Sequence, residues 1–321
     1  MQSIKSRMVL FMIRNRHLMQ FKLRRERVDH NTSIPKLREE YEAGAKKFGK
    51  IPAGIRVEAL SINGMTAEWI APVGASKEKV IFYTHGGGYI SGSCTDHRMH
   101  VAKFVEGTGL PALLFDYRLA PEHPFPAAVE DSVMAYCWLL EQGIAAENII
   151  IVGESAGGGL CLATLVSLRD QGIPLPCAGV ALSPWTDLKC SGESYRTNAR
   201  KDISTLGSWE IWGGYYIGNN DPTHPWLSPL YADLKGLPPV MIQVGDNEIL
   251  LDDSRRFAEK ARLAGVDVTL QIWEGMVHCF AILAPMFPEA VQAMEDIFAY
   301  IKAHIGIPMP EPVESRVPQR Q

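Results

Sequence analysis

Residues 149–157 have the sequence IIIVGESAG. Its first four residues are β-branched, which is typical of a strand buried on both faces of a parallel sheet. The stretch Gly157–Leu168 is rich in small and apolar residues and predicts a helix. Ser155 therefore lies on the turn between a strand and a helix. Gly153 and Gly157 supply the small neighbours that a tight turn needs.

A serine on such a turn is placed to act as a nucleophile. The helix that follows it directs its positive end toward the serine, and the N–H of Ala156 points to where an oxyanion would form. A Gly-x-Ser-x-Gly stretch also occurs by chance in structural turns. Other motifs must therefore decide whether Ser155 is catalytic.

The chain after Pro52 alternates short apolar runs with stretches of helical period. This pattern predicts an α/β fold with a mostly parallel eight-stranded sheet flanked by helices. The first two expected strands alternate apolar and polar residues, as an antiparallel edge does. We expect strands at 57–62, 67–71, 80–84, 112–115, 149–153, 178–182, 240–244 and 269–273, and helices near 97–106, 127–140, 158–169, 252–264 and 290–304.

A glycine triplet, Gly86-Gly87-Gly88, follows His85 at the end of the expected strand 80–84. Three consecutive glycines cost conformational entropy unless the backbone must approach something closely. We expect the N–H groups of Gly86 and Gly87 to donate to a substrate carbonyl oxygen. A phosphate-binding loop would need a Lys at P-loop spacing, and none follows. His85 is expected to anchor the loop rather than to act as a base.

A base and an acid are needed to activate a serine hydroxyl. His278 follows the last expected strand, where sites in parallel sheets gather, whereas the other histidines fit structural roles better. Carboxylates follow the strand before it, and the order serine, acid, histidine is that of α/β hydrolases. Asp252 and Asp253 also suit the first turn of a helix. Between Asp246 and Glu248 the physical argument alone does not decide.

These motifs together resemble the hormone-sensitive-lipase-like group of the α/β-hydrolase superfamily. The resemblance covers about Lys79 to Phe280 and includes Asp116–Ala127 and Gly275–His278. It implies an α/β-hydrolase fold with a helical lid and a serine carboxylesterase that acts on short to medium acyl esters, some members also opening lactones. It implies a small-molecule ester as partner, no metal and no cofactor. Such esterases are often homodimers.

The resemblance also bears on the acid. Family members commonly carry Asp-Pro-Leu-x-Asp, and here the aligned string is Glu248-Ile249-Leu250-Leu251-Asp252. This places Glu248 where the family has its acid, with Asp246 as the rival. The implied catalytic set is Ser155, Glu248 and His278, with Gly86, Gly87 and Ala156 around the oxyanion.

The family pattern divides the chain into a core and two lid segments. We expect an N-terminal helical lid segment at 1–50, a catalytic core at 51–187 and 226–307, a lid insertion at 188–225 and a flexible tail at 308–321. Arg118 and Glu122 are expected to form a buried pair beneath the glycine loop. Aromatic residues are candidates for the substrate pocket, although core packing explains each equally well: Tyr89, Trp185, Trp209, Trp212 and Tyr215.

The composition fits a small neutral substrate. The net charge of −4 and the pI near 6.2 give no field that recruits nucleic acid. The six cysteines form no CxxC pair, and we read them as free thiols in a reducing compartment. The early apolar run 8–13 is too short for a signal peptide or a membrane span. We therefore expect a cytoplasmic protein with no stable membrane insertion.

Residues 5–27 form a basic segment with an apolar stripe at helical period, made of Met8, Phe11, Met12 and Leu18. We expect this helix to pack its stripe over the body and to leave its charged face in solvent. The alternative is a helix that lies on a membrane surface.

Two other functions remain open at this point. An amidase would use the same triad with a poorer leaving group. A non-catalytic ligand-binding protein could share the fold, although that class usually shows damage to the triad.

Overall fold

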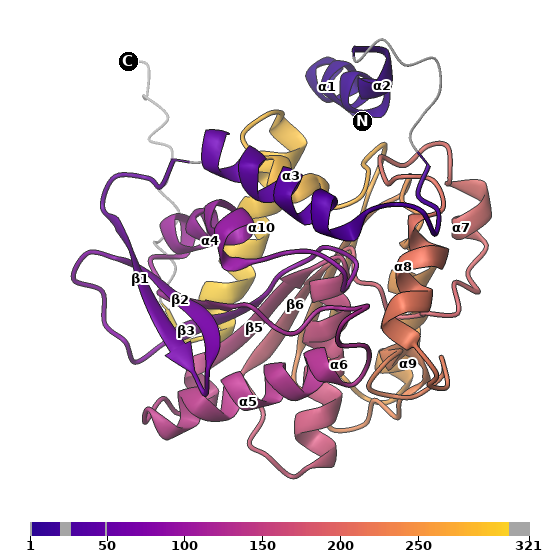
Figure 1. Ribbon diagram of the computed structural model, residues 1–321. Coiled ribbons are helices and arrows are strands. Elements are labelled where there is room, and N and C mark those ends of the chain that lie inside the picture. Colours follow the sequence, from indigo (N-terminus) through magenta and orange to yellow (C-terminus); the bar gives the residue numbers. More distant parts are fainter. Residues whose placement is uncertain (1, 20–26, 49, 308–321) are drawn as a thin grey trace, which may run out of the picture.

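The centre of the protein is a single eight-stranded sheet, seen in the computed structural model, which describes residues 2–19, 27–48 and 50–307 (Figure 1). The strand order is β1-β2-β4-β3-β5-β6-β7-β8. The strands from β4 to β8 are parallel, and β1 and β2 form the antiparallel edge. The predicted fold class is thus confirmed. The strands are β1 (Ile55–Ile62), β2 (Met65–Pro72), β3 (Val80–Thr84), β4 (Ala112–Phe115), β5 (Ile149–Glu154), β6 (Ala178–Leu182), β7 (Val240–Gly245) and β8 (Val268–Trp273).

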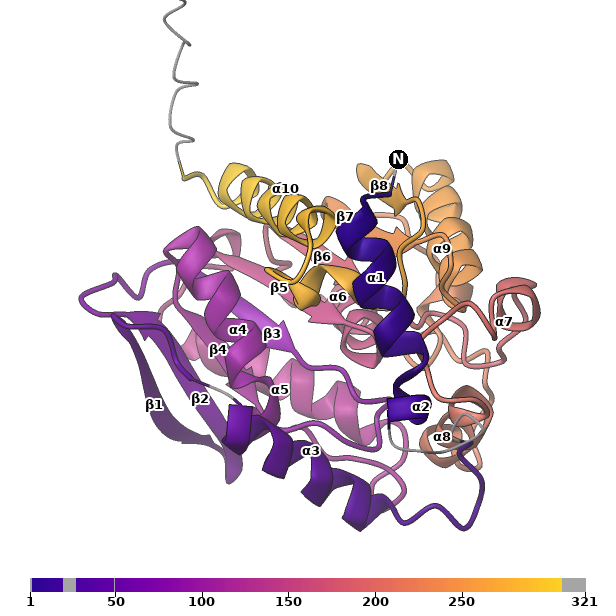
Figure 2. The same ribbon diagram turned by 90° about the horizontal axis from the view of Figure 1, so that it is seen from above.

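Helices cover both faces of this sheet (Figures 1 and 2). Alternate residues of β3 show why: Val80 and Phe82 join the core under α5, α6 and α9, whereas Ile81 and Tyr83 join the core under α4 and α10. The α-helices are α1 (Ile4–Arg14), α2 (Arg16–Met19), α3 (Ile34–Phe48), α4 (Cys94–Thr108), α5 (Ala127–Glu141), α6 (Ala156–Asp170), α7 (Ser194–Thr197), α8 (Ser208–Ile217), α9 (Leu251–Leu263) and α10 (Pro288–His304). Three 3₁₀ turns complete the order: η1 (Ala146–Asn148), η2 (Pro229–Tyr231) and η3 (Phe280–Leu283).

Helix α4 begins three residues earlier than expected, because a capping box starts it. The Ser93 side chain accepts the N–H of Asp96, and the Asp96 carboxylate accepts the N–H of Ser93. His97 consequently lies in the first turn of α4.

The packing of α1 differs from the expectation. Its inward face consists of Ser6, Val9 and Leu10, and Ser3 and Ser6 bond the Glu289 carboxylate at the start of α10. The apolar stripe that we expected to face the body points to solvent instead. The exposed fractions are 62% for Met8, 66% for Phe11, 49% for Met12 and 53% for Leu18.

Arg118 and Glu122 do not form the expected buried pair. The Arg118 guanidinium bonds the Asp131 carboxylate, with Nε 3.0 Å from Oδ1. Glu122 instead pairs with Arg38 of α3 at 2.8 Å, and Arg38 also donates to backbone carbonyls of the loops after β3 and β4. In place of the expected pair, Arg38 connects the N-terminal segment to the core.

The segment 188–225 carries α7 and α8 outside the sheet, and Figure 1 shows both on the side of α9. The expected tail at 308–321 lies outside the described residues. Within 2–19, 27–48 and 50–307, no helix has both the length and the apolar character required to cross a bilayer.

Candidate active site

Ser155 lies on a sharp turn between β5 and α6. Its φ of +58° is unusual for a residue with a side chain, and such strain persists only where neighbours enforce it. A Cβ at Gly157 would collide with the carbonyls of Thr84 and His85, and a Cβ at Gly153 would collide with Gly157. The two glycines expected from the sequence are therefore required by close backbone contacts.

The three side chains that the sequence predicts as a triad lie together. The Ser155 Oγ is 2.8 Å from the His278 Nε2, and the His278 Nδ1 is 3.3 Å from a Glu248 carboxylate oxygen. Glu248 is fully buried, and its other oxygen accepts from the Ser183 hydroxyl at 2.8 Å and from the Gly245 N–H at 2.6 Å. This order of contacts matches nucleophile, base and orienting acid.

Burial and mutual contact shift the pKa values of Glu248 and His278. Burial raises the pKa of the Glu248 carboxyl, and contact with His278 opposes that rise. For His278, burial lowers the pKa, but the contacts with Cys279 and Glu248 raise it more, so its pKa is shifted upward. The carboxylate of Asp246, the rival acid, instead accepts the N–H of Gly275 at 2.7 Å.

The glycine loop corrects one predicted oxyanion donor. The N–H of Gly86 donates to the Glu154 carboxylate at 2.8 Å, so the prediction that Gly86 faces an oxyanion is wrong. Gly87 and Gly88 have φ of +113° and +65°, and both line the cavity beside Ser155. Within the described part of the chain, the N–H groups of Gly87, Gly88 and Ala156 have no hydrogen-bond acceptor.

A buried network holds the glycine loop from behind. Besides the Gly86 N–H, Glu154 accepts from the Tyr83 hydroxyl at 2.5 Å and lies 3.2 Å from the His97 Nε2. The other ring nitrogen of His97 is 2.5 Å from the Asp96 carboxylate. Burial lowers the pKa of His97, but the two carboxylates raise it more, to about 10. A charged imidazolium thus bridges two carboxylates and fixes the loop.

The sequence did not predict this network. Glu154 carried no expected role, and His97 was expected to be a structural histidine in a helix. The available signal was the acid directly before Ser155, since a charge at that buried position requires partners.

A cavity of about 280 Å³ opens onto Ser155. Its walls include Trp209 and Trp212, both predicted as pocket residues, and the Trp209 ring meets the His278 ring edge-on at 5.3 Å. Tyr89 and Trp185, two further pocket candidates, are absent from the lining that the described residues provide. Both are buried in the core instead, where the Trp185 ring packs against Trp209. Tyr215 contacts the His30 ring and is absent from the lining that the described residues provide.

The segment 188–225 contacts both the loop that carries Glu248 and the loop that carries His278. Asp202 is fully buried, and its carboxylate accepts the His278 N–H and the Ile249 N–H, both at 3.0 Å. Asn198 donates to the carbonyls of Asp246 and Glu248 at 3.0 and 2.8 Å. One short segment therefore connects the acid loop with the histidine loop. Nothing in the sequence predicted this role for Asp202.

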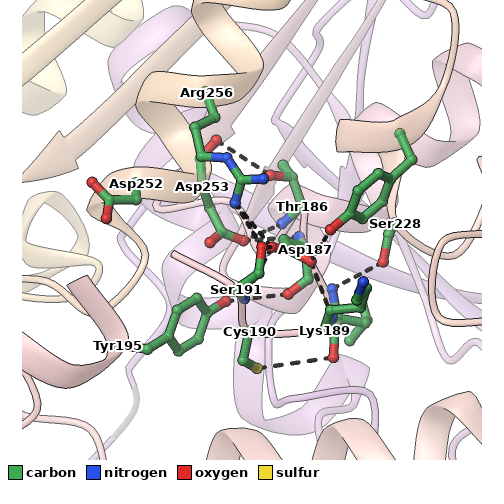
Figure 3. Close-up of polar contacts among 12 residues, drawn as sticks. Thr186, Asp187, Lys189, Cys190, Ser191, Tyr195, Ser228, Asp252, Asp253 and Arg256 are labelled. Carbon is green, nitrogen blue, oxygen red and sulfur yellow. Dashed lines mark hydrogen bonds and ion pairs between the residues drawn. The ribbon is translucent and has the colours of Figure 1, made fainter. Parts of the chain in front are cut away.

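A second polar cluster joins the insertion to α9 (Figure 3). The buried Asp187 accepts from the Ser191 hydroxyl, the Tyr231 hydroxyl and Arg256, the last at 3.0 Å. Asp253 accepts the N–H groups of Thr186 and Asp187 at 2.9 and 2.8 Å through one oxygen, and its other oxygen has no partner among the described residues. These contacts anchor the start of the insertion behind the acid loop.

Comparison with known proteins identifies the family. A family model described as the alpha/beta hydrolase fold matches residues 81–282. The chain belongs to this family. An "Acetyl-hydrolase" of Streptomyces hygroscopicus is 39% identical over 86% of this chain and 92% of that relative, and an "Esterase" of Acinetobacter venetianus is 38% identical over 76% and 80%.

Solved structures place the chain within the α/β hydrolases. An esterase from the bacterial hormone-sensitive lipase family is 42% identical, with a TM-score of 0.85 over 95% of this chain and all of that one. The esterase EstE5, soaked with p-nitrophenyl butyrate, is 40% identical with a TM-score of 0.86 over the same shares. The resemblance to the hormone-sensitive-lipase-like group is thus confirmed, and this α/β hydrolase is a carboxylic ester hydrolase.

Among the residues that the structure describes, no three His, Cys, Asp or Glu side chains are grouped as metal ligands. The polar groups at the cavity include the Ser155 hydroxyl, the His278 imidazole and the N–H groups of Gly87 and Gly88.

Proposed function

We propose that this α/β hydrolase cleaves short to medium acyl esters through an acyl-enzyme on Ser155. The observation that carries the proposal is the 2.8 Å contact between the Ser155 Oγ and the His278 Nε2, beside a cavity lined by free N–H groups. The Ser155 Oγ attacks the ester carbonyl carbon while His278 takes its proton, and Glu248 stabilises the imidazolium. The N–H groups of Gly87, Gly88 and Ala156 hold the oxyanion.

The second half of the cycle regenerates the enzyme. His278 gives its proton to the leaving alcohol as the carbon–oxygen bond breaks, and the acyl group stays on Ser155. Water then attacks the acyl carbon as His278 takes one of its protons. Collapse of the second tetrahedral intermediate releases the carboxylic acid and returns the proton to Ser155. The same attack would open a lactone, in which acid and alcohol stay joined.

The cavity supports a limited acyl length. Its volume of about 280 Å³ and the tryptophan wall leave room for a small apolar chain. One similar protein is named an acetyl-hydrolase, and the similar EstE5 was soaked with a butyrate ester. These names support the assignment of short acyl chains to this enzyme.

We assign the lid to segments 1–50 and 188–225. Both segments contribute to the cavity wall, the first through Arg16 and Tyr41 and the second through Ile203, Trp209 and Trp212.

The six free cysteines support a cytoplasmic location, because thiols persist in a reducing compartment.

The experiment is a p-nitrophenyl ester series from acetate to dodecanoate, with a lactone panel and p-nitroanilides alongside. We expect kcat/KM to peak between acetate and hexanoate and to fall at least about tenfold by dodecanoate, because longer chains exceed the cavity.

Ser155→Ala should lower kcat by about 10⁴-fold or more and abolish labelling by a fluorophosphonate probe. Faster anilide than ester turnover would support an amidase instead. A folded wild type that neither turns over nor labels would support a binding protein.

A further inference from the structure

The outward face of helix α1 is apolar, although it faces solvent. Helices on the surface of a globular protein normally turn such a face toward the core. Here the core-facing side is Ser6, Val9 and Leu10, on the opposite side of the helix. We call the solvent-facing set the α1 apolar face: Ile4, Met8, Phe11 and Met12, with exposed fractions of 76%, 62%, 66% and 49%.

Exposed apolar side chains are concentrated on this part of the molecule. Ten large hydrophobic residues of the described chain are exposed, and five of them are Leu18 and the four residues of the α1 apolar face. Single exposed hydrophobics are ordinary, but a contiguous set on one helix indicates an interaction surface.

The edges of this face are basic. Lys5 and Arg7 lie beside it and are exposed, and Arg16 continues the same segment. Residues 2–19 contain no Asp or Glu, whereas the whole chain has a net charge of −4. A positive rim around an apolar stripe therefore stands out against an acidic molecule. This combination is that of a helix that lies in the interface of an anionic lipid layer.

The same segment borders the active-site cavity. Arg16 lines the cavity, and its guanidinium donates to the Ile203 carbonyl of the insertion at 3.1 Å. Figure 2 shows α1 followed by α2 beside α8, the helix that carries Trp209 and Trp212. A surface that binds α1 would therefore lie close to the cavity entrance.

We propose that the α1 apolar face docks on an anionic lipid surface and holds the cavity entrance near esters in that surface. The benefit for catalysis rests on the proposed esterase function, but the docking itself does not. A second copy of the chain is a poorer occupant, because a two-fold contact through this face would bring two basic rims, each with Lys5 and Arg7, close together. The lipid surface instead offers both an apolar layer and negative charge.

Docking can be tested without turnover. The full chain with Ser155→Ala is sedimented with vesicles of phosphatidylcholine alone and of phosphatidylcholine with 30% phosphatidylglycerol. We expect at least about tenfold more bound protein on the anionic vesicles. Adding Met8→Ser and Phe11→Ser should reduce that binding at least about tenfold, and Lys5→Gln with Arg7→Gln should reduce it to the level seen on neutral vesicles.

The matched control carries Leu263→Ser, which removes an even more exposed apolar side chain (84%) at the C-terminal end of α9. It should bind as well as the parent, and thermal unfolding should show that all variants fold. Absence of binding to anionic vesicles, or equal binding by the Met8/Phe11 variant, would overturn the proposal. So would a dimer in sedimentation velocity that dissociates in the Met8/Phe11 variant, since the face would then be a contact between copies. Turnover of a soluble ester by wild type reports separately on the esterase proposal.

Discussion

Glu248 and Asp246 are separated by one residue in the loop after β7, but their carboxylates have different partners. Glu248 reaches the His278 Nδ1, whereas Asp246 caps the Gly275 N–H. Replacing Glu248 by Ala should therefore leave His278 unoriented and lower kcat by about 10³- to 10⁴-fold. Asp246→Ala should lower it less than about tenfold. Turnover of p-nitrophenyl butyrate by both variants, with thermal unfolding as the folding control, measures the difference.

The opposite ranking of the two variants would remove Glu248 from the proposed triad. If both variants lost activity and Asp246→Ala also failed to fold, the hydrogen bond from the Gly275 N–H to Asp246 would be needed for the structure. Asp246→Asn separates these cases, because its side-chain carbonyl can still accept the Gly275 N–H.

The physical argument from the sequence could not choose between these two carboxylates, and only the family resemblance favoured Glu248. Both carboxylates follow β7, and what distinguishes Glu248 is its hydrogen bonds. It accepts the hydroxyl of Ser183, which is distant in the sequence, and the N–H of Gly245 in the same turn. The Gly86 assignment failed for a similar reason. Its N–H donates to Glu154 at the end of β5, a residue 68 positions away in the chain, and no local sequence pattern predicts such a contact.

At the scale of elements, segment 188–225 contacts the loops of Glu248 and His278 as well as the cavity. Asp202 accepts the backbone N–H of His278 and that of Ile249, which follows the acid. It acts on the reaction through these two loops, so it is a positioning residue. Asp202→Ala should lower kcat about 10- to 100-fold, because small displacements of catalytic groups have effects of this size. KM should change less.

The measurement is the split between kcat and KM on p-nitrophenyl butyrate. Asp202→Asn should recover part of kcat, because the amide carbonyl can still accept one of the two N–H groups. Glu193→Ala in the same insertion is the control, since Glu193 forms only a surface pair with Arg196 among the contacts described for its side chain. A KM effect that exceeds the kcat effect would contradict a positioning role.

The sequence predicted that α1 is a helix but not which of its faces packs against the body. The hydrophobic period of α1 predicted a helix, and the helix is present. The period alone could not show which side meets the body, because three small or aliphatic residues and a serine–glutamate contact to α10 hold the helix in place. An amphipathic pattern identifies two faces, and only packing shows which is inward.

The sheet as a whole followed from the sequence because its signals are local and repeated. Each buried strand is a short β-branched or apolar run, and all eight appear within two residues of the expected bounds. Long-range polar contacts carry the rest, including Glu154 with His97 and the anchors of the insertion. Buried polar groups need partners, but the sequence does not show which partner each one finds.

The anchor between the insertion and α9 makes the stability of the whole molecule depend on pH. Burial, together with the nearby Asp187, raises the pKa of Asp253 from 3.8 to about 8. The folded state therefore holds this proton more tightly than the unfolded chain. The contribution of Asp253 to stability is complete below about pH 4 and is lost progressively as the pH rises toward 8.

Asp253→Asn should remove this dependence, because an amide does not ionise and its carbonyl can still accept the N–H groups of Thr186 and Asp187. Urea unfolding at pH 5, 6.5 and 8 would measure it. The free energy of unfolding of the wild type should fall relative to that of the variant at each step upward in pH. If the free energies of unfolding of wild type and variant changed in parallel over this pH range, Asp253 would already be ionised in the folded protein. Its negative charge would then be stabilised indirectly by Arg256, which pairs with the neighbouring Asp187.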